Sequence, residues 1–265
     1  MTDIVTQFGH ADHNGPRHAN SNEEPHNEKA AQKNALRAAN DNPSDGVAGE
    51  AETFRISRPD MMHRTIQFTA KRAVDIAASG ASLVALAPVL LMIAAAIKLE
   101  SRGPALFRQH RTGLNGQLFG ILKFRSMYTD LGDPTGVAQT VDDDRRITRT
   151  GRLLRRTNLD ELPQLWNVLV GDMSLVGPRP HVPGMLAAGK PYEELVEGYE
   201  HRHMMRPGLT GLAQCRGLRG PTHNRWKAIR RIACDIEYVK NFSLLLDAKI
   251  IVRTIVNEFG GGTGS

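Results

Sequence analysis

The stretch that decides the fold is residues 76–97, IAASGASLVALAPVLLMIAAAI, which contains no charged side chain. At about 1.5 Å per residue, a straight helix of this length measures roughly 33 Å, enough to cross a bilayer core of about 30 Å. Pro88 lies near the middle, where it removes a backbone hydrogen bond and clashes with the preceding turn. A buried apolar hairpin in a soluble domain is the alternative. We interpret the stretch as a membrane segment that bends at Pro88.

The charges on both sides of this stretch indicate how it enters the membrane. Positive side chains flank both ends: Arg64, Lys71, Arg72, Lys98, Arg102, Arg108 and Arg111. A spanning helix carries positive residues mainly on its cytoplasmic side, whereas a helix that bends and leaves by the same face places both flanks there. We therefore predict a re-entrant helix hairpin over residues 61–100, with a simple spanning helix as the alternative.

Residues 1–60 differ in composition from the rest of the chain. They contain six Lys/Arg against ten Asp/Glu and almost no large apolar side chains. Such a segment cannot bury enough apolar surface to offset its ordering entropy, so we predict a disordered polar tail without a signal peptide. The two cysteines, Cys215 and Cys234, show neither metal-ligand nor disulfide spacing, which is typical of a reduced, cytoplasm-facing chain.

The remainder of the chain is strongly basic. Residues 61–265 carry 28 Lys/Arg against 18 Asp/Glu, a net charge of +10. This balance favours a polyanionic partner, such as nucleic acid, anionic lipid or a phosphorylated small molecule. A nucleic-acid binder would interleave aromatic side chains with its arginines and would leave the apolar stretch unexplained, so we expect no nucleic-acid partner.

Downstream of the apolar stretch the sequence predicts a short β-ribbon at the membrane surface. Residues 103–109 and 119–124 contain short apolar pieces, separated by a glycine-containing turn. The second piece would deliver Lys123 and Arg125, for which a solvated strand face is the alternative. Residues 130–144 are acidic and predict a mobile loop.

A run of arginines follows this loop. It contains Arg145, Arg146, Arg149, Arg152, Arg155 and Arg156, of which the first, third, fourth and last would share one helical face. Such a face can be merely solvated, or it can lie on anionic lipid headgroups. Because the run leads directly into a pair of carboxylates, we assign part of it to phosphate binding. Arg155 is the first candidate, since a guanidinium can pair with two phosphate oxygens.

The pair of carboxylates is Asp160 and Glu161. Pro163 is tolerated only in a first helical turn, so we predict that the pair begins a helix, where Asn158 and Glu161 could form a capping box. The alternative to capping is chemistry, because a carboxylate that attacks phosphorus forms an acyl phosphate. Oxygen ligands and a diphosphate substrate suit Mg²⁺.

A second motif follows closely. Arg179 lies between Pro178 and Pro180, and two prolines stiffen the backbone around it. A stiff backbone would preorganise the guanidinium as a partner for a phosphoryl oxygen. The alternative is an ordinary turn with an exposed arginine.

In combination, these stretches resemble the bacterial sugar transferase family, the monotopic polyprenyl-phosphate phosphoglycosyl transferases that begin exopolysaccharide assembly. The resemblance is carried, in order, by residues 71–75, 76–97, 103–109, 123–127, 159–164, 171–180 and 206–214. It implies that a UDP-sugar gives its phospho-sugar to an aspartate, and that polyprenyl (undecaprenyl) phosphate then takes it. A catalytically silent, membrane-anchored assembly or regulatory protein is the alternative.

The resemblance also implies roles for individual residues. Asp160 would be the nucleophile and a Mg²⁺ contact, Glu161 its acid/base or metal-assisting neighbour, Arg155, Arg179, Lys123 and Arg125 the phosphate ligands, and Pro88 the site of the membrane bend. The implied partners are the UDP-sugar, polyprenyl phosphate and inner-membrane lipid, with a homodimer left open. The implied location is the bacterial inner membrane, with the catalytic domain facing the cytoplasm.

The expected architecture is α+β and mainly helical. A re-entrant membrane hairpin (61–100) precedes a small cytoplasmic catalytic domain (101–258) with a short β-ribbon, and residues 259–265 form a flexible end. Three helices are expected in the C-terminal part, over residues 191–205, 225–241 and 244–259.

Overall fold

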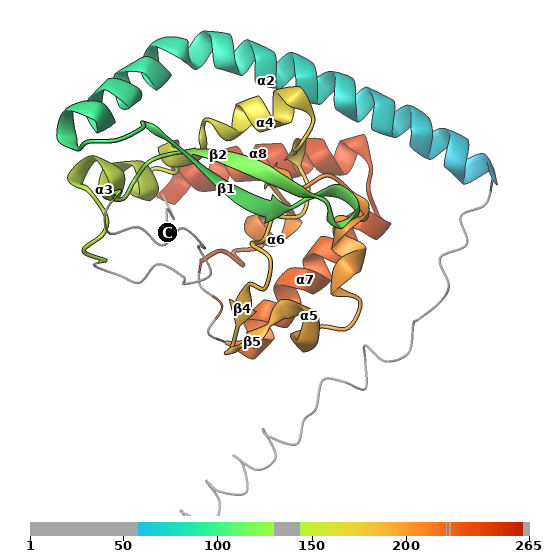
Figure 1. Cartoon of the computed structure of the whole chain (residues 1–265). Coiled ribbons are helices and arrows are strands. Elements are labelled where there is room, and N and C mark those ends of the chain that lie inside the picture. The colour runs from blue at the N-terminus through green and yellow to red at the C-terminus, as the bar shows by residue number, and fades with distance from the viewer. Residues whose placement is uncertain (1–57, 130–143, 221, 223, 262–265) are drawn as a thin grey trace, which may run out of the picture. The chain divides into compact units, whose positions relative to one another are not determined.

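A computed structural model of the chain describes residues 58–129, 144–220, 222 and 224–261 (Figure 1). The predicted tail up to residue 57, the predicted loop at 130–143 and the last four residues lie outside these ranges. One helix, α2 (Arg58–Glu100), forms the N-terminal part of the described chain and begins inside the bounds predicted for the tail.

Helix α2 continues through Pro88 without a break. Figure 1 shows it arching over the rest of the described chain, with its C-terminal part turning down toward α3 (Arg149–Arg156). Proline frees only one carbonyl of the preceding turn, so a helix can bend there and continue on both sides. The predicted hairpin of two arms is therefore not confirmed, and a re-entrant course stays a prediction.

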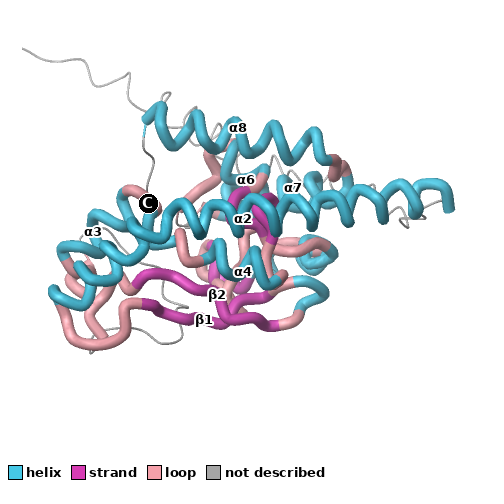
Figure 2. The backbone as a smooth tube through the Cα atoms, turned by 90° about the horizontal axis from the view of Figure 1, so that it is seen from above, coloured by secondary structure: helices cyan, strands magenta, loops and turns pink. Residues whose placement is uncertain are grey.

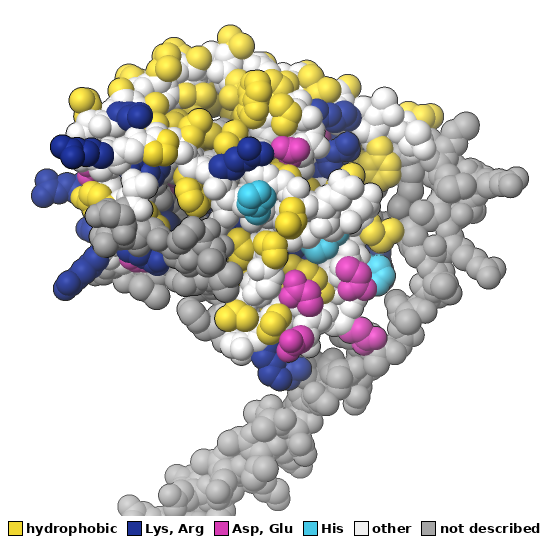
Figure 3. Space-filling view, in the orientation of Figure 1, with side chains coloured by type: hydrophobic (Ala, Val, Ile, Leu, Met, Phe, Trp, Pro, Cys, Tyr) yellow, Lys and Arg dark blue, Asp and Glu magenta, His cyan; other side chains and the backbone are white. Residues whose placement is uncertain are grey.

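The distribution of side chains around α2 is inverted relative to a soluble core helix. Three of its buried side chains are polar, namely Lys71, Asp75 and Ser79, and the apolar Ile97 is buried near its end. Apolar side chains point outward instead, with Leu99 89% exposed, and they cover the top of the molecule in Figure 3. Residues Thr65–Glu100 have the length and composition to cross a membrane. An 18-residue window within them has a mean hydropathy of 2.4, and only 6% of that window is buried. This exposed apolar surface indicates contact with lipid.

The predicted β-ribbon is confirmed. Strands β1 (Leu106–Thr112) and β2 (Leu118–Phe124) pair antiparallel, with Leu106 opposite Phe124 and Thr112 opposite Leu118. Directly opposite residues share a face of the ribbon, and alternate residues along each strand return to that face. In this register Lys123 of β2 and Arg111 of β1 lie on the same face.

Helix α3 is shorter than the predicted basic helix. It begins after Thr148, whose hydroxyl accepts a hydrogen bond from Gly151 N. Arg145 therefore precedes the helix, and the predicted four-arginine face contains only three helical arginines. Gly151 is required by close packing, because a Cβ at this position would lie 2.0 Å from the carbonyl oxygen of Ser126.

A short turn and a helix follow α3. The 3₁₀ turn η3 (Leu159–Glu161) leads into α4 (Gln164–Val170), which ends at Gly171 in the left-handed conformation. The side chain of Asn167 in α4 accepts a hydrogen bond from Leu122 N and donates one to Gly120 O. These two bonds take the place of a neighbouring strand along β2 and fix α4 against the ribbon.

The remaining elements form the other side of the described chain. Strand β3 (Ser174–Val176) pairs parallel with β6 (Gly208–Thr210), and β4 (Leu186–Ala187) pairs antiparallel with β5 (Lys190–Pro191). The helices are α5 (Tyr192–Leu195), η4 (Tyr199–Met204), α6 (Leu212–Cys215), α7 (Arg225–Lys240) and α8 (Leu244–Gly261). Seen from above, α8 lies on one side of α2 and the ribbon on the other (Figure 2).

Two of the three predicted C-terminal helices are confirmed, as α7 and α8. The single helix predicted over residues 191–205 is wrong, because Gly198 adopts a left-handed conformation between α5 and η4. Apolar side chains of α7 and α8 form the main core together with β3, including Val176, Tyr238 and Ile250. This core supports β3, which leads into the turn that carries Arg179.

Candidate active site

The two adjacent carboxylates lie in a turn before the helix rather than at its first residues. Asp160 and Glu161 belong to η3, and α4 begins three residues later, at Gln164. Asn158 adopts the left-handed conformation with φ 55°, and its side chain makes no capping hydrogen bond. The predicted capping box is therefore wrong, because the Glu161 side chain binds partners elsewhere in the chain.

Glu161 forms ion pairs with two cations from distant parts of the sequence. Lys123 Nζ lies 2.7 Å from Glu161 Oε1, and Arg179 Nη2 lies 2.5 Å from the same oxygen. Burial alone would raise the pKa of Glu161, but the charges of Arg179 and Lys123 outweigh it and hold that pKa well below its ordinary value. Glu161 is therefore a permanent anion at neutral pH, which suits the positioning of cations better than proton donation.

Asp160 is in a different state from its neighbour. Its side chain is nearly buried, with the residue 8% exposed, and its carboxylate accepts no hydrogen bond from any described residue. Burial raises the pKa of Asp160, Lys123 opposes this shift, and the negative charge of Glu161 adds to it. A desolvated carboxylate without hydrogen-bond donors keeps its lone pairs available for attack.

Three cations act on Asp160 through their charge. Lys123, Arg155 and Arg179 each lower its pKa, so three of the four predicted phosphate ligands lie near the carboxylate. Arg155 is the arginine of α3 that faces the site, as predicted. Together with Asp160 and Glu161, these side chains form what we call the Asp160 cluster.

Arg125, the fourth predicted phosphate ligand, does not belong to this cluster. It is buried, and its guanidinium donates to the carbonyl oxygens of Arg102, Ser101 at 2.9 Å and Ile97 at 3.5 Å. These are the carbonyls that follow or end α2, which lack partners within the helix. Arg125 therefore closes the C-terminus of α2. Strand β2 ends at Phe124, so Arg125 is not part of the ribbon face that carries Lys123.

Arg111 is close to the site, although the sequence indicated it only as a flank of the apolar stretch. Burial lowers the pKa of Arg111 to about 10, and the nearby charge of Arg179 acts in the same direction. The signal that could have found it is the ribbon register, because Arg111 and Lys123 lie on one face. Arg111 thus adds a further guanidinium beside the Asp160 cluster.

The turn that carries Arg179 is held through its carbonyl groups. Three successive carbonyls accept hydrogen bonds from outside the turn: Arg179 O from Arg202 Nη2 at 2.5 Å, Pro180 O from Arg111 Nη1 at 3.3 Å, and His181 O from Thr112 N at 2.9 Å. Proline has no N–H to donate, so these acceptors fix the backbone instead. The stiffness of the turn around Arg179 stays a prediction, and the hydrogen bonds from β1 and η4 support it.

Arg202 is in turn fixed by a buried acid. Its Nε and Nη2 lie 3.0 and 2.8 Å from Asp235 Oδ2 of α7, and both side chains are fully buried. Neither residue was a candidate from the sequence. Asp235 lies within a predicted helix whose apolar face gave no indication of an ion pair.

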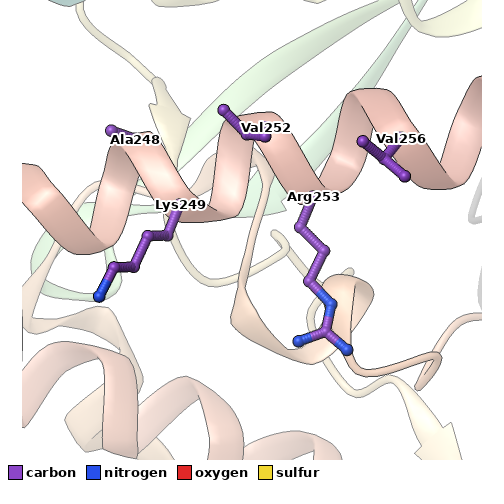
Figure 4. A pocket seen from close by; sticks show the side chains of 5 residues that line it. All are labelled: Ala248, Lys249, Val252, Arg253 and Val256. Atoms are coloured by element: carbon purple, nitrogen blue, oxygen red, sulfur yellow. The ribbon is translucent and has the colours of Figure 1, made fainter.

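Two surface hollows lie away from the Asp160 cluster. One of about 390 Å³ lies along α8, where Ala248, Val252 and Val256 project on one side and Lys249 and Arg253 on the other (Figure 4). A second, of about 330 Å³, lies between α6, α7 and α8. Neither contains a residue of the Asp160 cluster.

The arrangement suits chemistry at a phosphate. Several cations surround a nucleophilic carboxylate, and they can neutralise the oxygens of a phosphoryl group while a bond forms to phosphorus. Among the described residues, no group of three or more His, Cys, Asp or Glu side chains could hold a metal ion. A magnesium ion that shares its shell with substrate oxygens and water needs only one or two carboxylates, and the Asp160 donor set fits that requirement.

Comparison with known proteins agrees with this chemistry. A family model described as bacterial sugar transferase matches residues 66–261. An exopolysaccharide production protein, PSS, of Rhizobium leguminosarum bv. phaseoli is 59% identical over 194 residues, covering 73% of this chain and 97% of the relative. An undecaprenyl-phosphate glucose phosphotransferase of Komagataeibacter xylinus is 52% identical, covering 71% of this chain and 35% of the relative. A UDP-glucose:undecaprenyl-phosphate glucose-1-phosphate transferase of Caulobacter vibrioides is 48% identical, covering 83% of this chain and 81% of the relative.

Proposed function

The chain belongs to the bacterial sugar transferase family, and from this premise we propose that it transfers a phospho-sugar from a UDP-sugar to polyprenyl phosphate. The observation that carries the proposal is the Asp160 cluster. It contains one nearly buried carboxylate that accepts no hydrogen bond from the part of the chain that the structure describes, with Lys123, Arg155 and Arg179 near it. A second carboxylate, Glu161, holds two of these cations in place.

The reaction would proceed in two displacements at one phosphorus atom. An oxygen of Asp160 attacks the phosphorus that bears the sugar, the bond to the bridging oxygen breaks, and UMP leaves with the bonding electrons. The product is an acyl phosphate between Asp160 and the phospho-sugar. A phosphate oxygen of polyprenyl phosphate then attacks the same phosphorus, the carboxylate of Asp160 leaves, and a polyprenyl diphospho-sugar forms.

The other members of the cluster would stabilise charge. Arg155 and Arg179 neutralise the phosphoryl oxygens. Lys123 pairs with Glu161, and its charge also acts on the carboxylate of Asp160. Glu161 positions the cations rather than transferring a proton, because its low pKa keeps it ionised.

Magnesium belongs to the same proposal. Asp160 would be its protein ligand, since the oxygens of Glu161 are taken by Lys123 and Arg179. When bound, Mg²⁺ would supply positive charge at the diphosphate. Loss of activity on chelation, restored by Mg²⁺, is the measurement that checks this part.

The names of the relatives make glucose the first donor sugar to test and exopolysaccharide synthesis the first pathway. The exposed apolar surface of α2 supports a membrane location. We propose the bacterial inner membrane, with the Asp160 cluster on the cytoplasmic side, because a nucleotide sugar is a cytoplasmic substrate.

The experiment that tests the proposal is to trap the intermediate. Purified full-length protein is incubated with UDP-glucose and Mg²⁺ without lipid acceptor, and intact-protein mass spectrometry follows. We expect a mass increase of one phospho-glucose that maps to Asp160 and that disappears on addition of undecaprenyl phosphate. Asp160→Asn should lose the adduct and at least about a thousandfold of the UMP release, because the nucleophile is removed.

Asp172→Asn is the matched control, since it removes a nearby acid that contacts Asn167 and not the cations. If the Asp160→Asn variant still transferred sugar at the normal rate, the proposed mechanism would be wrong. If the wild type and the Asp172→Asn control turned over no UDP-sugar in a panel of donors, a silent assembly protein would be the better interpretation.

A further inference from the structure

We propose that the outward face of α3, formed by Arg149, Arg152 and Arg156 and called here the α3 arginine face, binds the headgroups of anionic phospholipids. The proposal rests on the membrane location that belongs to the proposed function, but not on the chemistry at Asp160. It assigns a role to the part of the arginine run that the Asp160 cluster does not use.

The residues of α3 are divided among three directions. Leu154 is buried in a cluster with Ile97 and Phe124, and Arg155 faces Asp160. Arg149, Arg152 and Arg156 are exposed, and no described carboxylate forms an ion pair with any of them. The α3 arginine face therefore carries three exposed charges at helical spacing that no described acid compensates.

The position of α3 is fixed to the membrane helix. The carboxylate of Glu100, the last residue of α2, accepts hydrogen bonds from Arg149 N at 2.7 Å and Thr150 N at 3.0 Å. Leu154 packs against Ile97, and Leu90 and Ile93 of α2 border the same cluster. Because both the helix N-terminus and its apolar side are tied to α2, the α3 arginine face has a set orientation relative to the apolar surface of α2.

Apolar side chains are exposed next to these charges. Leu153 of α3 is 58% exposed and Leu99 at the end of α2 is 89% exposed, while Lys98 and Arg102 add cations at the same place. Figure 3 shows dark-blue side chains gathered where the apolar surface of α2 ends. Mixed cationic and aliphatic side chains at the border of an apolar surface are typical of a membrane interface, where aliphatic groups enter the acyl boundary and cations meet phosphates.

Charge complementarity then selects the lipid. Each lysine or arginine near an anionic surface strengthens binding several-fold, whereas a zwitterionic surface offers no net charge. A nucleic acid fits less well, because α3 contains no aromatic side chain on which a base could stack. The shared chemistry is a phosphate diester at the bilayer surface, and the occupant is the bulk anionic phospholipid of the inner leaflet.

The test places a photoreactive group within the face. Leu153 is replaced by p-benzoylphenylalanine in the full-length chain, which is reconstituted into vesicles of equal phosphatidylcholine and phosphatidylglycerol and illuminated. Mass spectrometry then counts the lipid adducts at residue 153. We expect phosphatidylglycerol adducts to exceed phosphatidylcholine adducts by about two- to fivefold, and the excess to fall with added salt.

Variants separate charge from fold. Arg149→Gln, Arg152→Gln and Arg156→Gln together should bring the ratio to about one, while the three changes to lysine should keep the excess because they keep the charge. The matched control removes three charges from α7, by Arg225→Gln, Lys227→Gln and Arg230→Gln. Figure 1 places α7 below the ribbon, on the side away from α2, so the control should retain the excess.

Two outcomes would overturn the proposal: no lipid adduct at residue 153, or a phosphatidylglycerol excess that survives loss of all three arginines. The assay contains neither UDP-sugar nor acceptor, so it is read independently of catalysis. Asp160→Asn should give the wild-type ratio. A wild-type protein that turns over no UDP-sugar but gives the expected lipid ratio would contradict the proposed function alone.

Discussion

The buried pair Arg202–Asp235 and the Asp160 cluster are built from the same chemical groups but are used differently. Arg202 and Asp235 are fully buried, and the arginine also donates to Arg179 O and Tyr199 Oη. Each nitrogen of its guanidinium therefore has a hydrogen-bond partner within the fold. In the Asp160 cluster the Arg179 side chain is 40% exposed, and Asp160 accepts no hydrogen bond from any described residue. Polar groups that are partly solvated and lack a protein hydrogen-bond partner can bind a ligand. Polar groups whose hydrogen bonds are all made within the protein stabilise the fold instead.

The two regions are also physically connected. Arg202 binds the backbone carbonyl of Arg179, whose side chain binds Glu161. The buried pair Arg202–Asp235 therefore supports the position of the Arg179 side chain in the Asp160 cluster. Substitutions in each region should separate effects on stability from effects on turnover, and the following predictions start with the largest expected effect.

Asp235→Asn should produce the largest loss of stability. It leaves the Arg202 guanidinium buried without a counter-charge, which typically costs about 3–5 kcal/mol of unfolding free energy. The measurement is denaturant unfolding of the detergent-solubilised full chain. A loss below about 1 kcal/mol would show that the pair is not the anchor that its burial indicates.

Arg179→Gln should act on turnover instead. Removing a preorganised donor to developing phosphoryl charge typically lowers kcat by about 10²- to 10³-fold, while Lys123 stays paired with Glu161 in the variant. Steady-state UMP release and thermal unfolding are measured on the same sample. Arg216→Gln is the matched control, because Arg216 is also 40% exposed and also pairs with a glutamate, Glu237. Equal kcat losses in the two variants would contradict the assignment.

The pH dependence should distinguish the two neighbouring carboxylates. The folded-state pKa of Glu161 lies below its ordinary value of 4.5, so its ion pairs contribute stability above that pH, and the contribution is lost as the pH falls through the lowered pKa. The pKa of Asp160 is raised from 3.8, so protonation favours the folded state and Asp160→Asn should be neutral or stabilising near pH 7. Thermal unfolding of wild type, Glu161→Gln and Asp160→Asn across acidic pH checks both signs. A Glu161→Gln deficit that grew on acidification would refute the first.

The smallest effect is expected two residues along α7 from Asp235. Glu237 pairs with Arg216 at the surface, where both side chains are largely exposed and solvent screens the interaction. Glu237→Gln should therefore change the unfolding free energy by less than about 1 kcal/mol. Measured beside Asp235→Asn on the same helix, it isolates burial as the cause of the larger loss.

Local patterns in the sequence predicted much of what the structure shows. An uncharged apolar stretch predicted the exposed apolar surface of α2, glycine-containing turns between short apolar pieces predicted the ribbon, and helical spacing predicted α7 and α8. The residues of the Asp160 cluster were all candidates. Arg155, Asp160, Glu161 and Arg179 lie close together in the sequence and indicate phosphate chemistry, whereas Lys123 was implied by the family resemblance. The capping box was wrong because an ion pair with a distant cation replaced a local hydrogen bond.

Tertiary structure decided how these groups are paired. Lys123 reaches Glu161 across 38 positions, Arg202 reaches Asp235 across 33, and Arg125 closes α2 from 24 positions beyond Ser101. Hydropathy and spacing indicate which face of one element is apolar. They carry no information about which cation of one element pairs with which carboxylate or carbonyl of another. The sequence by itself therefore determined the elements and the chemical groups available, whereas the packing of α2, the ribbon and α7 decided that Glu161 is paired with Lys123 and Arg179 while Asp160 accepts no hydrogen bond from a described residue.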